Sequence, residues 1–217
     1  MPKLNVLLIS LGKPHIFDEQ YHELLAALSA HTSYKEVTLS KDVAAALSTL
    51  KPAAVLITNP NFARVQHSEL HARVVDYVKS GGKVIYCGLY PGIIAPALLE
   101  KHFETVWGLP WKVGTFNRTV FYLVPQRPAA LQHKADLAEE IEMKAVRIKG
   151  ADKKDFVYAT TPDSRVEELG KAEFAHKPDE AAVLYTTIGN GHLGYIGDVG
   201  AEDECVDIVI AMLGLPA

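Results

Sequence analysis

The sequence predicts an α/β fold in which helices cover both faces of a mostly parallel sheet. Two observations carry this prediction. Four strand-like apolar runs in the N-terminal half are each followed by a segment with helical periodicity. Three of these runs are almost continuously apolar, which is typical of strands buried on both faces. Repeated β-α units with right-handed crossovers place a parallel sheet between two helical layers.

The first two β-α units occupy the first fifty residues. The run KLNVLLISL predicts a strand over residues 3–11, and residues 17–30 predict a helix. The apolar stripe of this helix consists of Tyr21, Leu24, Leu25 and Leu28. Residues 34–40, YKEVTLS, alternate like a strand with one buried face, and residues 42–50 predict a short helix that ends before Lys51-Pro52.

The third and fourth units follow the same plan. AAVLIT, residues 53–58, predicts a buried strand that ends at Asn59-Pro60-Asn61. A long helix then runs up to Gly81-Gly82, which ends it. KVIYCG, residues 83–88, predicts the fourth strand, and residues 93–102 predict the helix that follows it.

The C-terminal half departs from this plan and predicts an antiparallel excursion. Residues 111–125 are aromatic and β-branched, and further short strands are predicted over residues 143–150 and 155–162. Gly189-Asn190-Gly191 lies between two strand-like runs, which indicates a hairpin. Residues 202–213 predict a final helix.

Composition and charge exclude several classes of function. The 217 residues are 48% hydrophobic and 22% charged, with a formal net charge of −4, as is typical of a soluble globular protein. The chain has no dense block of lysine and arginine, so we expect no nucleic-acid and no membrane partner. Its apolar runs are shorter than the ~18 residues that a spanning helix needs. No internal repeat or linker interrupts the sequence, and we expect a single domain over residues 1–217.

The cysteines and the N-terminal residues favour a cytoplasmic location. Cys87 and Cys205 lie in apolar segments and fit no metal or redox spacing. The first residues, MPKLN, lead directly into a strand and lack the apolar stretch and cleavage site of a signal peptide. We therefore expect a reduced protein of the cytoplasm.

The stretch SGGKVIYCGLYPG joins an apolar strand to a turn rich in glycine and proline. In a nucleophile elbow, small residues stand two positions before and two positions after the nucleophile. Cys87 fails this test because Ile85 and Leu89 occupy those positions, so we interpret it as a core cysteine. The frame Gly88–Gly92 meets the test and places Tyr90 at the tip of the turn.

Two segments resemble a known superfamily. VKSGGKVIYCGLYPGIIAPAL, residues 78–98, resembles the segment of class I glutamine amidotransferase-like domains that carries Gly-x-Cys-x-Gly. AAVLYTTIGNGHLGYIGDVGAEDE, residues 181–204, resembles their late hairpin, which leads to a catalytic histidine and an acid. The resemblance implies a flavodoxin-like three-layer α/β/α sandwich with a mostly parallel sheet and an antiparallel excursion, formed by one domain.

The catalytic residues of the superfamily are not matched. Tyr90 stands at the position of the cysteine (Leu89 if the alignment slips by one), and Gly197-Asp198 stands where the histidine would be. The trailing acid is Glu202 or Asp203. Glutamine hydrolysis needs a thiolate and a base to activate it. The chain therefore resembles branches without amidotransferase activity, such as trehalose-utilisation-like proteins.

A candidate site is predicted at the carboxyl ends of the strands, where open α/β sheets bind ligands. We predict three catalytic acid, base or orienting groups: His15, Tyr90 and Asp198. We predict three substrate-binding residues: Asn59, Asn61 and Glu202. The alternatives are an exposed loop position for His15 and a turn cap for Asp198.

Histidines at helical spacing raise the question of a metal site. His67 and His71 in HSELH share one helix face and can ligate one metal, with a third ligand from elsewhere. Histidines at a helix border are the alternative, and we assign no metal and no cofactor. Trp107 and Trp111 either line a pocket or, as we predict, belong to the core of the excursion.

Two hypotheses for the function follow. The first is an enzyme of the hydrolase or lyase type that acts on a small polar metabolite at the carboxyl edge of the sheet. The alternative is a catalytically silent binding or assembly module on the same scaffold. A homodimer is compatible with either.

Overall fold

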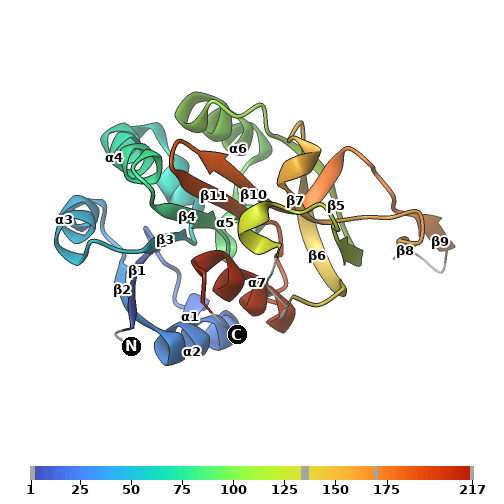
Figure 1. The fold of residues 1–217 in the computed structure, drawn as a ribbon, viewed down its shortest axis with the longest axis horizontal. Helices are drawn as coiled ribbons and strands as arrows, with labels where there is room; N and C mark the ends of the chain where they lie inside the picture. The colour runs from blue at the N-terminus through green and yellow to red at the C-terminus, as the bar shows by residue number, and fades with distance from the viewer. Residues whose placement is uncertain (1–2, 133–136, 169–170, 216–217) are drawn as a thin grey trace.

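A nine-stranded sheet forms the centre of the protein, and a separate two-stranded sheet accompanies it (Figure 1). The structure is a computed structural model that describes residues 3–132, 137–168 and 171–215. The strands are β1 (Leu4–Ile9), β2 (Thr32–Val37), β3 (Ala54–Ile57), β4 (Lys83–Tyr86), β5 (Lys112–Leu123), β6 (Glu140–Lys149), β7 (Phe156–Ala159), β8 (Arg165–Glu168), β9 (Lys171–Phe174), β10 (Glu180–Ile188) and β11 (Gly191–Ile196).

One half of the large sheet is parallel. Its strands lie in the order β2-β1-β3-β4-β11, and each pairs in parallel with its neighbour. Strands β1, β3 and β4 are the apolar runs that the sequence predicts, and all four residues of β3 are buried. This half positions the carboxyl ends of β4 and β11 side by side, because Tyr86 pairs with Tyr195.

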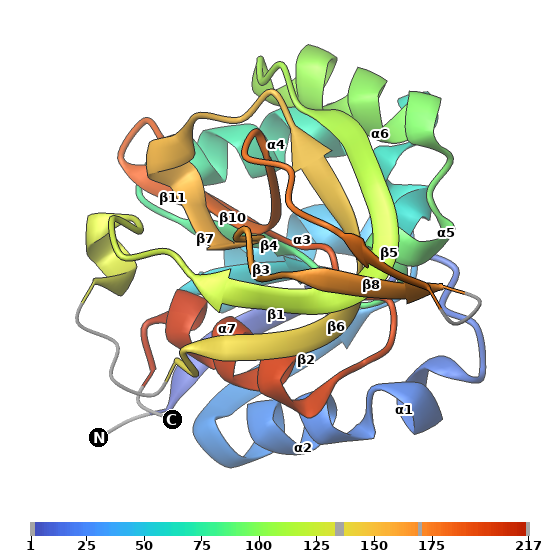
Figure 2. The ribbon, with the colours of Figure 1, turned by 90° about the vertical axis from the view of Figure 1, so that its right-hand side faces the viewer.

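The other half is antiparallel and closes into a barrel. A two-residue turn, Gly189-Asn190, connects β10 to β11 as the predicted hairpin. Strand β10 pairs with both β6 and β7, and β5 pairs with the same two strands, so these four strands form a closed ring. The prediction of a flavodoxin-like three-layer α/β/α sandwich with a mostly parallel sheet is therefore wrong. Antiparallel pairings outnumber parallel ones in this sheet, and the excursion is a barrel (Figure 2).

Irregular register explains how the sheet curls. Strand β5 shifts register against β6 between Val113 and Phe116, and β10 shifts against β7 between Ala181 and Leu184. An extra residue in one strand increases the local twist and bends the strand. Closure also pairs the edges that an open antiparallel sheet would leave exposed.

Helices cover both faces of the parallel half (Figure 1). They are α1 (Phe17–Gln20), α2 (His22–His31), α3 (Ser40–Leu50), α4 (Ser68–Lys79), α5 (Leu89–Ile93), α6 (Pro96–His102) and α7 (Asp203–Leu213). Short single-turn segments are η1 (Pro60–Ala63), η2 (Val65–His67), η3 (Phe103–Trp107), η4 (Ala129–Leu131) and η5 (Lys153–Asp155). In the part of the chain that the structure describes, none of the helices has the length and apolar character to span a membrane.

The two helical layers bury two separate cores. Helices α1, α2 and α7 pack on one face of the sheet with Val6, Ile85 and Cys87. Helices α3, α4 and α6 pack on the other face with Tyr86 and Tyr90. Neighbouring residues of β4 thus point to opposite faces, as the alternation of side chains along a strand requires.

Two predicted helices are each divided in the structure. The helix predicted over residues 17–30 breaks at Tyr21, whose φ of −109° and ψ of 29° are not helical. The helix predicted over residues 93–102 begins only at Pro96, because the residue before a proline is disfavoured in the helical conformation, and Ala95 is extended. The final helix is confirmed as α7, which starts one residue after Glu202.

The tryptophans and Cys87 are core residues, as predicted. Cys87 is 2% exposed, and Trp107 and Trp111 are both buried. Phe116 lies on the outer surface of the barrel and is 52% exposed. The aromatic residues of the excursion therefore divide between the core and the surface.

Candidate functional site

The turn after β4 has a glycine at its strained position. Gly88 adopts φ 63° and ψ −133°, a backbone conformation that residues with a side chain rarely adopt. A Cβ atom at this position would lie 3.2 Å from Cβ of Thr58 and 3.4 Å from the ring of Phe17. The strand-to-helix elbow is therefore present, but its strained residue offers no side chain for chemistry.

Tyr90 lies two residues beyond that position, within α5, and is fully buried. Its ring centroid is 4.6 Å from that of Tyr86 in the core beneath α4 and α6. The Tyr90 hydroxyl has no hydrogen-bond partner among the described residues. Burial, chiefly, holds the pKa of Tyr90 well above its ordinary value.

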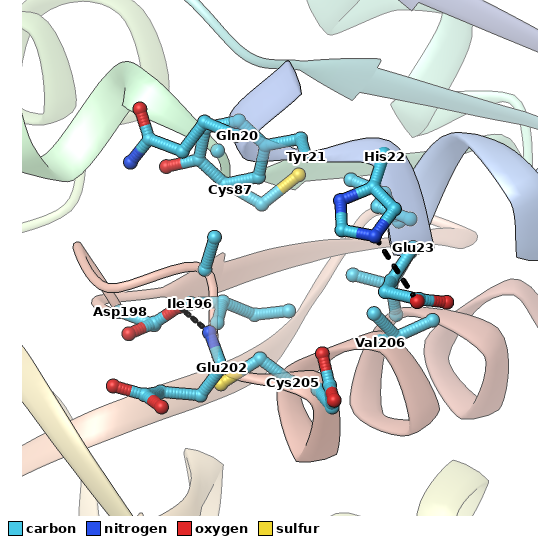
Figure 3. Close-up of a pocket in the computed structure, with 15 residues that line it drawn as sticks. Gln20, Tyr21, His22, Glu23, Cys87, Ile196, Asp198, Glu202, Cys205 and Val206 are labelled. Atoms are coloured by element: carbon cyan, nitrogen blue, oxygen red, sulfur yellow. Dashed lines mark hydrogen bonds and ion pairs between the residues drawn. The ribbon is translucent and has the colours of Figure 1, made fainter. Parts of the chain in front are cut away.

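A small pocket lies at the carboxyl ends of β4 and β11, between α2 and α7 (Figure 3). Its free volume of about 50 Å³ holds one or two small groups. Figure 3 shows Tyr21 and Cys87 on one side of the pocket, and Glu202 and Cys205 on the other. The residues that line it are Gln20, Tyr21, His22, Glu23, Leu24, Cys87, Gly88, Ile196, Asp198, Ala201, Glu202, Asp203, Cys205, Val206 and Val209.

Of the three predicted catalytic residues, Asp198 lies at this pocket. The pocket is on the face of the sheet that buries Cys87, whereas Tyr90 belongs to the core of the opposite face. His15 is exposed in the loop between β1 and α1 and does not line the pocket. The structure therefore does not bring these three residues together.

Asp198 is engaged by the backbone of the turn that leads to α7. It is 5% exposed; its Oδ1 accepts from the amide of Gly200 at 2.9 Å, and its Oδ2 accepts from the amide of Glu202 at 3.0 Å. Burial raises the pKa of Asp198, the hydrogen bonds from these two amides oppose that shift, and the charge of Glu202 adds to it. This geometry matches the turn cap that the sequence offered as the alternative.

Tyr21 and the two cysteines add a phenol and two thiols to the polar groups of the pocket. The buried Tyr21 hydroxyl has no partner among the described residues, and burial first, then the charge of Asp198, raises its pKa. Burial raises the pKa of the Cys87 thiol to about 12 and that of Cys205 well above its ordinary value. Both cysteines are therefore thiols and not thiolates near neutral pH, and they are poor nucleophiles.

Tyr21 was not predicted as a site residue from the sequence. The residue falls on the apolar stripe of the predicted helix, which suggested a core position. In the structure it sits at the break between α1 and α2, where the chain turns it toward β4 and α7. A phenol in an otherwise aliphatic stripe was the available signal, because a buried hydroxyl usually needs a partner.

The predicted substrate-binding asparagines hold the loops after β1 and β3. The Asn59 side chain accepts from the amide of Asn61 at 2.9 Å and caps η1. The Asn61 side chain donates to the carbonyl oxygen of Leu11 at 3.1 Å. Both amides are thus used within the fold, and neither residue lines the pocket.

Glu202 is the predicted binding residue that does line the pocket. It forms an ion pair with Arg118 of β5, which also lies 3.6 Å from Glu142. This pair connects the barrel to the start of α7. The Glu202 carboxylate lies near Asp198, and the Arg118 guanidinium offsets its charge.

The two histidines considered for a metal do not form a site. His67 precedes α4 and is partly exposed, whereas His71 is buried and its Nε2–H donates to the Phe62 carbonyl oxygen at 2.6 Å. Among the residues that the structure describes, no group of three histidine, cysteine, aspartate or glutamate side chains is arranged to hold a metal ion.

Comparisons with known proteins give a likeness in fold alone. The sequence matches no protein-family model and no curated protein. A β-galactosidase from Bacillus circulans sp. alkalophilus is similar in structure, with a TM-score of 0.52 and 15% identity over 96% of this chain and 30% of that chain. A ThuA-like protein from Parabacteroides merdae ATCC 43184 has a TM-score of 0.53 and 11% identity over 100% of this chain and 92% of that chain. An exo-β-1,4-mannosidase from Opitutaceae bacterium strain TAV5 has a TM-score of 0.49 and 12% identity over 97% and 36% of the two chains.

These likenesses place the chain beside a ThuA-like protein at the level of the fold. This likeness in fold agrees with the resemblance of the sequence to trehalose-utilisation-like proteins. The chain spans about 30% of the length of the β-galactosidase, so the activity of that whole protein does not pass to this chain. The flavodoxin-like assignment is not supported by these neighbours.

Proposed function

We propose that the protein is a catalytically silent binding module on a glutamine amidotransferase-like scaffold. Gly88 carries this proposal, because the strained position of the elbow has no side chain and hence no nucleophile. The nearby thiol of Cys87 does not replace it, since burial keeps it protonated. Asp198 has both carboxylate oxygens engaged by backbone amides, which fits a structural cap.

The ligand is a small molecule that presents a hydroxyl or an amino group to the pocket. Glu23, Glu202 and Asp203 are among the residues that line the pocket, so the pocket favours hydrogen-bond donors and disfavours anions. The Tyr21 hydroxyl has no partner within the described ranges and gains one when such a group enters. The volume of about 50 Å³ admits one such group and leaves the rest of the ligand between α2 and α7.

The test combines a turnover assay with a binding assay. The purified protein is incubated with glutamine, and we expect glutamate release to equal that of a protein-free blank. Thermal shifts are then measured with glycerol and glucose, which offer hydroxyl groups, and with ethylamine, which offers an amino group alone. We expect a stabilising probe to lose its effect in Tyr21→Phe, which removes only the hydroxyl.

Tyr34→Phe is the matched control, because Tyr34 is a partly buried tyrosine of β2 that does not line the pocket. It should respond to the probes as the wild type does. Glutamate release above the blank would overturn the catalytically silent assignment. An equal response of the wild type and Tyr21→Phe to every probe would overturn the pocket as the binding site.

A further inference from the structure

A second concavity lies on the opposite side of the sheet from the pocket at Asp198. It is a groove of about 840 Å³ between α4 and α6, and residues of η1, η2 and η3 also line it. Figure 2 shows α4 and α6 together on one side of the sheet, with α2 and α7 on the other. A volume of this size suits a small organic ligand. Because it uses different residues, this groove is independent of the function proposed above.

Two buried histidines contribute to the groove. His71 is 6% exposed and His102 is 2% exposed, and their rings meet edge to face with centroids 5.0 Å apart. Nε2 of His71 lies 2.6 Å from the carbonyl oxygen of Phe62. A carbonyl oxygen can only accept, so the proton of His71 is on Nε2.

The tautomer of His102 follows from its neighbours. Trp107 Nε1–H can only donate, and it donates to the Tyr86 hydroxyl oxygen at 2.9 Å. The Tyr86 hydroxyl therefore has its own proton free to donate to Nε2 of His102, 2.7 Å away. Burial lowers the pKa of His102 to about 3, with His71 adding to the shift, so the ring is neutral. A neutral ring that accepts at Nε2 carries its proton on Nδ1.

That Nδ1–H is a buried donor without a partner among the described residues. An unpaired buried polar group costs about 1–3 kcal/mol, so a ligand that accepts this hydrogen bond recovers the lost interaction. A carboxylate is the strongest common acceptor. Both histidines line the groove, so a ligand in it lies beside this donor.

The charge and the apolar walls of the groove also fit a ligand that carries a carboxylate. Arg64 and Lys101 line the groove, and neither forms an ion pair within the described ranges 3–132, 137–168 and 171–215. Asp76 is the acidic residue that lines it, so the lining carries a net positive charge. Val75, Leu98 and other small apolar side chains supply the walls.

We propose that the groove between α4 and α6 binds a small organic carboxylate, whose carboxylate accepts from His102 Nδ1–H and whose apolar part lies against Val75 and Leu98. Arg64 and Lys101 add long-range attraction for the negative charge. The proposal specifies an amphipathic monocarboxylate and excludes a neutral alcohol of the same chain length.

The test titrates hexanoate and 1-hexanol into protein with nitrogen-15-labelled histidine. We expect hexanoate to bind and to move the His102 Nδ1 resonance, while the exposed His15 resonance stays unchanged. Lys101→Glu should weaken the binding of hexanoate by about fivefold, which corresponds to the loss of one exposed charge interaction. Lys79→Glu is the matched control, because Lys79 is an exposed lysine of α4 that does not line the groove.

Four outcomes would overturn the proposal. If 1-hexanol binds as tightly as hexanoate, the carboxylate does not contribute to binding. If Lys101→Glu and Lys79→Glu weaken hexanoate binding equally, the anion does not bind beside Lys101 in the groove. Binding without any change at His102 Nδ1 would separate the ligand from the histidine pair, and the absence of hexanoate binding would exclude the site.

Discussion

The hydroxyl of Tyr86 donates to Nε2 of His102 across 2.7 Å and joins the end of β4 to the last residue of α6. The same hydroxyl oxygen accepts from Trp107 Nε1–H at 2.9 Å. One phenol therefore satisfies a buried acceptor on His102 and a buried donor on Trp107. Both of these groups lose their partner when the hydroxyl is removed.

Tyr86→Phe is expected to lower the free energy of unfolding by about 2–4 kcal/mol, because it leaves two buried polar groups unpaired. Urea denaturation followed by circular dichroism measures the change. Tyr195→Phe is the matched control: Tyr195 is equally buried, and its hydroxyl makes one hydrogen bond, to the Val146 carbonyl oxygen. A smaller loss in Tyr86→Phe than in Tyr195→Phe would contradict the bridging role.

Tyr90→Phe is expected to act in the opposite direction. The Tyr90 hydroxyl is fully buried and has no partner among the described residues, so it costs stability in the folded state. Its removal should leave the free energy of unfolding unchanged or raise it by about 1–2 kcal/mol. The same urea measurement applies. A loss of more than about 1 kcal/mol would show that this hydroxyl has a partner.

Gly88→Ala is expected to destabilise the protein more than Gly108→Ala. Gly88 has φ 63° and ψ −133°, and a Cβ there would crowd Thr58 at 3.2 Å, so we expect a loss of about 2–4 kcal/mol. Gly108 has φ 67° and ψ 23° with no atom within 4 Å of the added Cβ, so its cost is about 1–2 kcal/mol. Thermal and urea unfolding of both variants check the order, and a reversed order would contradict the strained elbow.

Local patterns in the sequence predicted the parallel half of the fold but not the barrel. The continuous apolar runs of β1, β3 and β4 and the Gly-Asn-Gly hairpin are properties of short segments, and the structure has them. The barrel depends on β7, Phe156–Ala159, which pairs with both β5 and β10. The choice of partner for so short a strand is made by tertiary packing, and alternation in its residues does not specify it.

The candidate sites also divide into residues that local sequence patterns predict and residues that only the tertiary structure places. The sequence placed Asp198 and Glu202 at the carboxyl edge of the sheet because both follow a predicted strand, and both line the pocket there. Tyr90 was placed at the same edge, but it lies in α5 and packs in the core on the opposite face of the sheet. His102 was not predicted as a site residue. Its partner Tyr86 lies sixteen residues away in the sequence, and only the packing of the fold brings the two together.

Acidification should destabilise the protein through His102. Its pKa is lowered to about 3 in the folded protein, mainly by burial, whereas the ordinary value is 6.5. Between these values the unfolded chain binds the proton and the folded protein does not, so protonation favours unfolding. The stabilising contribution of the neutral ring is complete above about pH 6.5 and is lost as the pH falls toward about 3, by up to about 1.4 kcal/mol per pH unit. Burial also lowers the pKa of His71, which acts in the same direction.

The measurement is the free energy of unfolding from urea curves at several pH values between about 7 and about 4. The difference between the wild type and His102→Phe isolates this group, because the carboxylates contribute equally to both proteins. We expect the advantage of the wild type to shrink as the pH falls. His15→Gln, which removes an exposed histidine, controls for the loss of a histidine as such. A difference between the wild type and His102→Phe that stays constant with pH would mean that His102 is protonated alike in the folded and unfolded chain, and the donor assigned to its Nδ1 would then lose its basis.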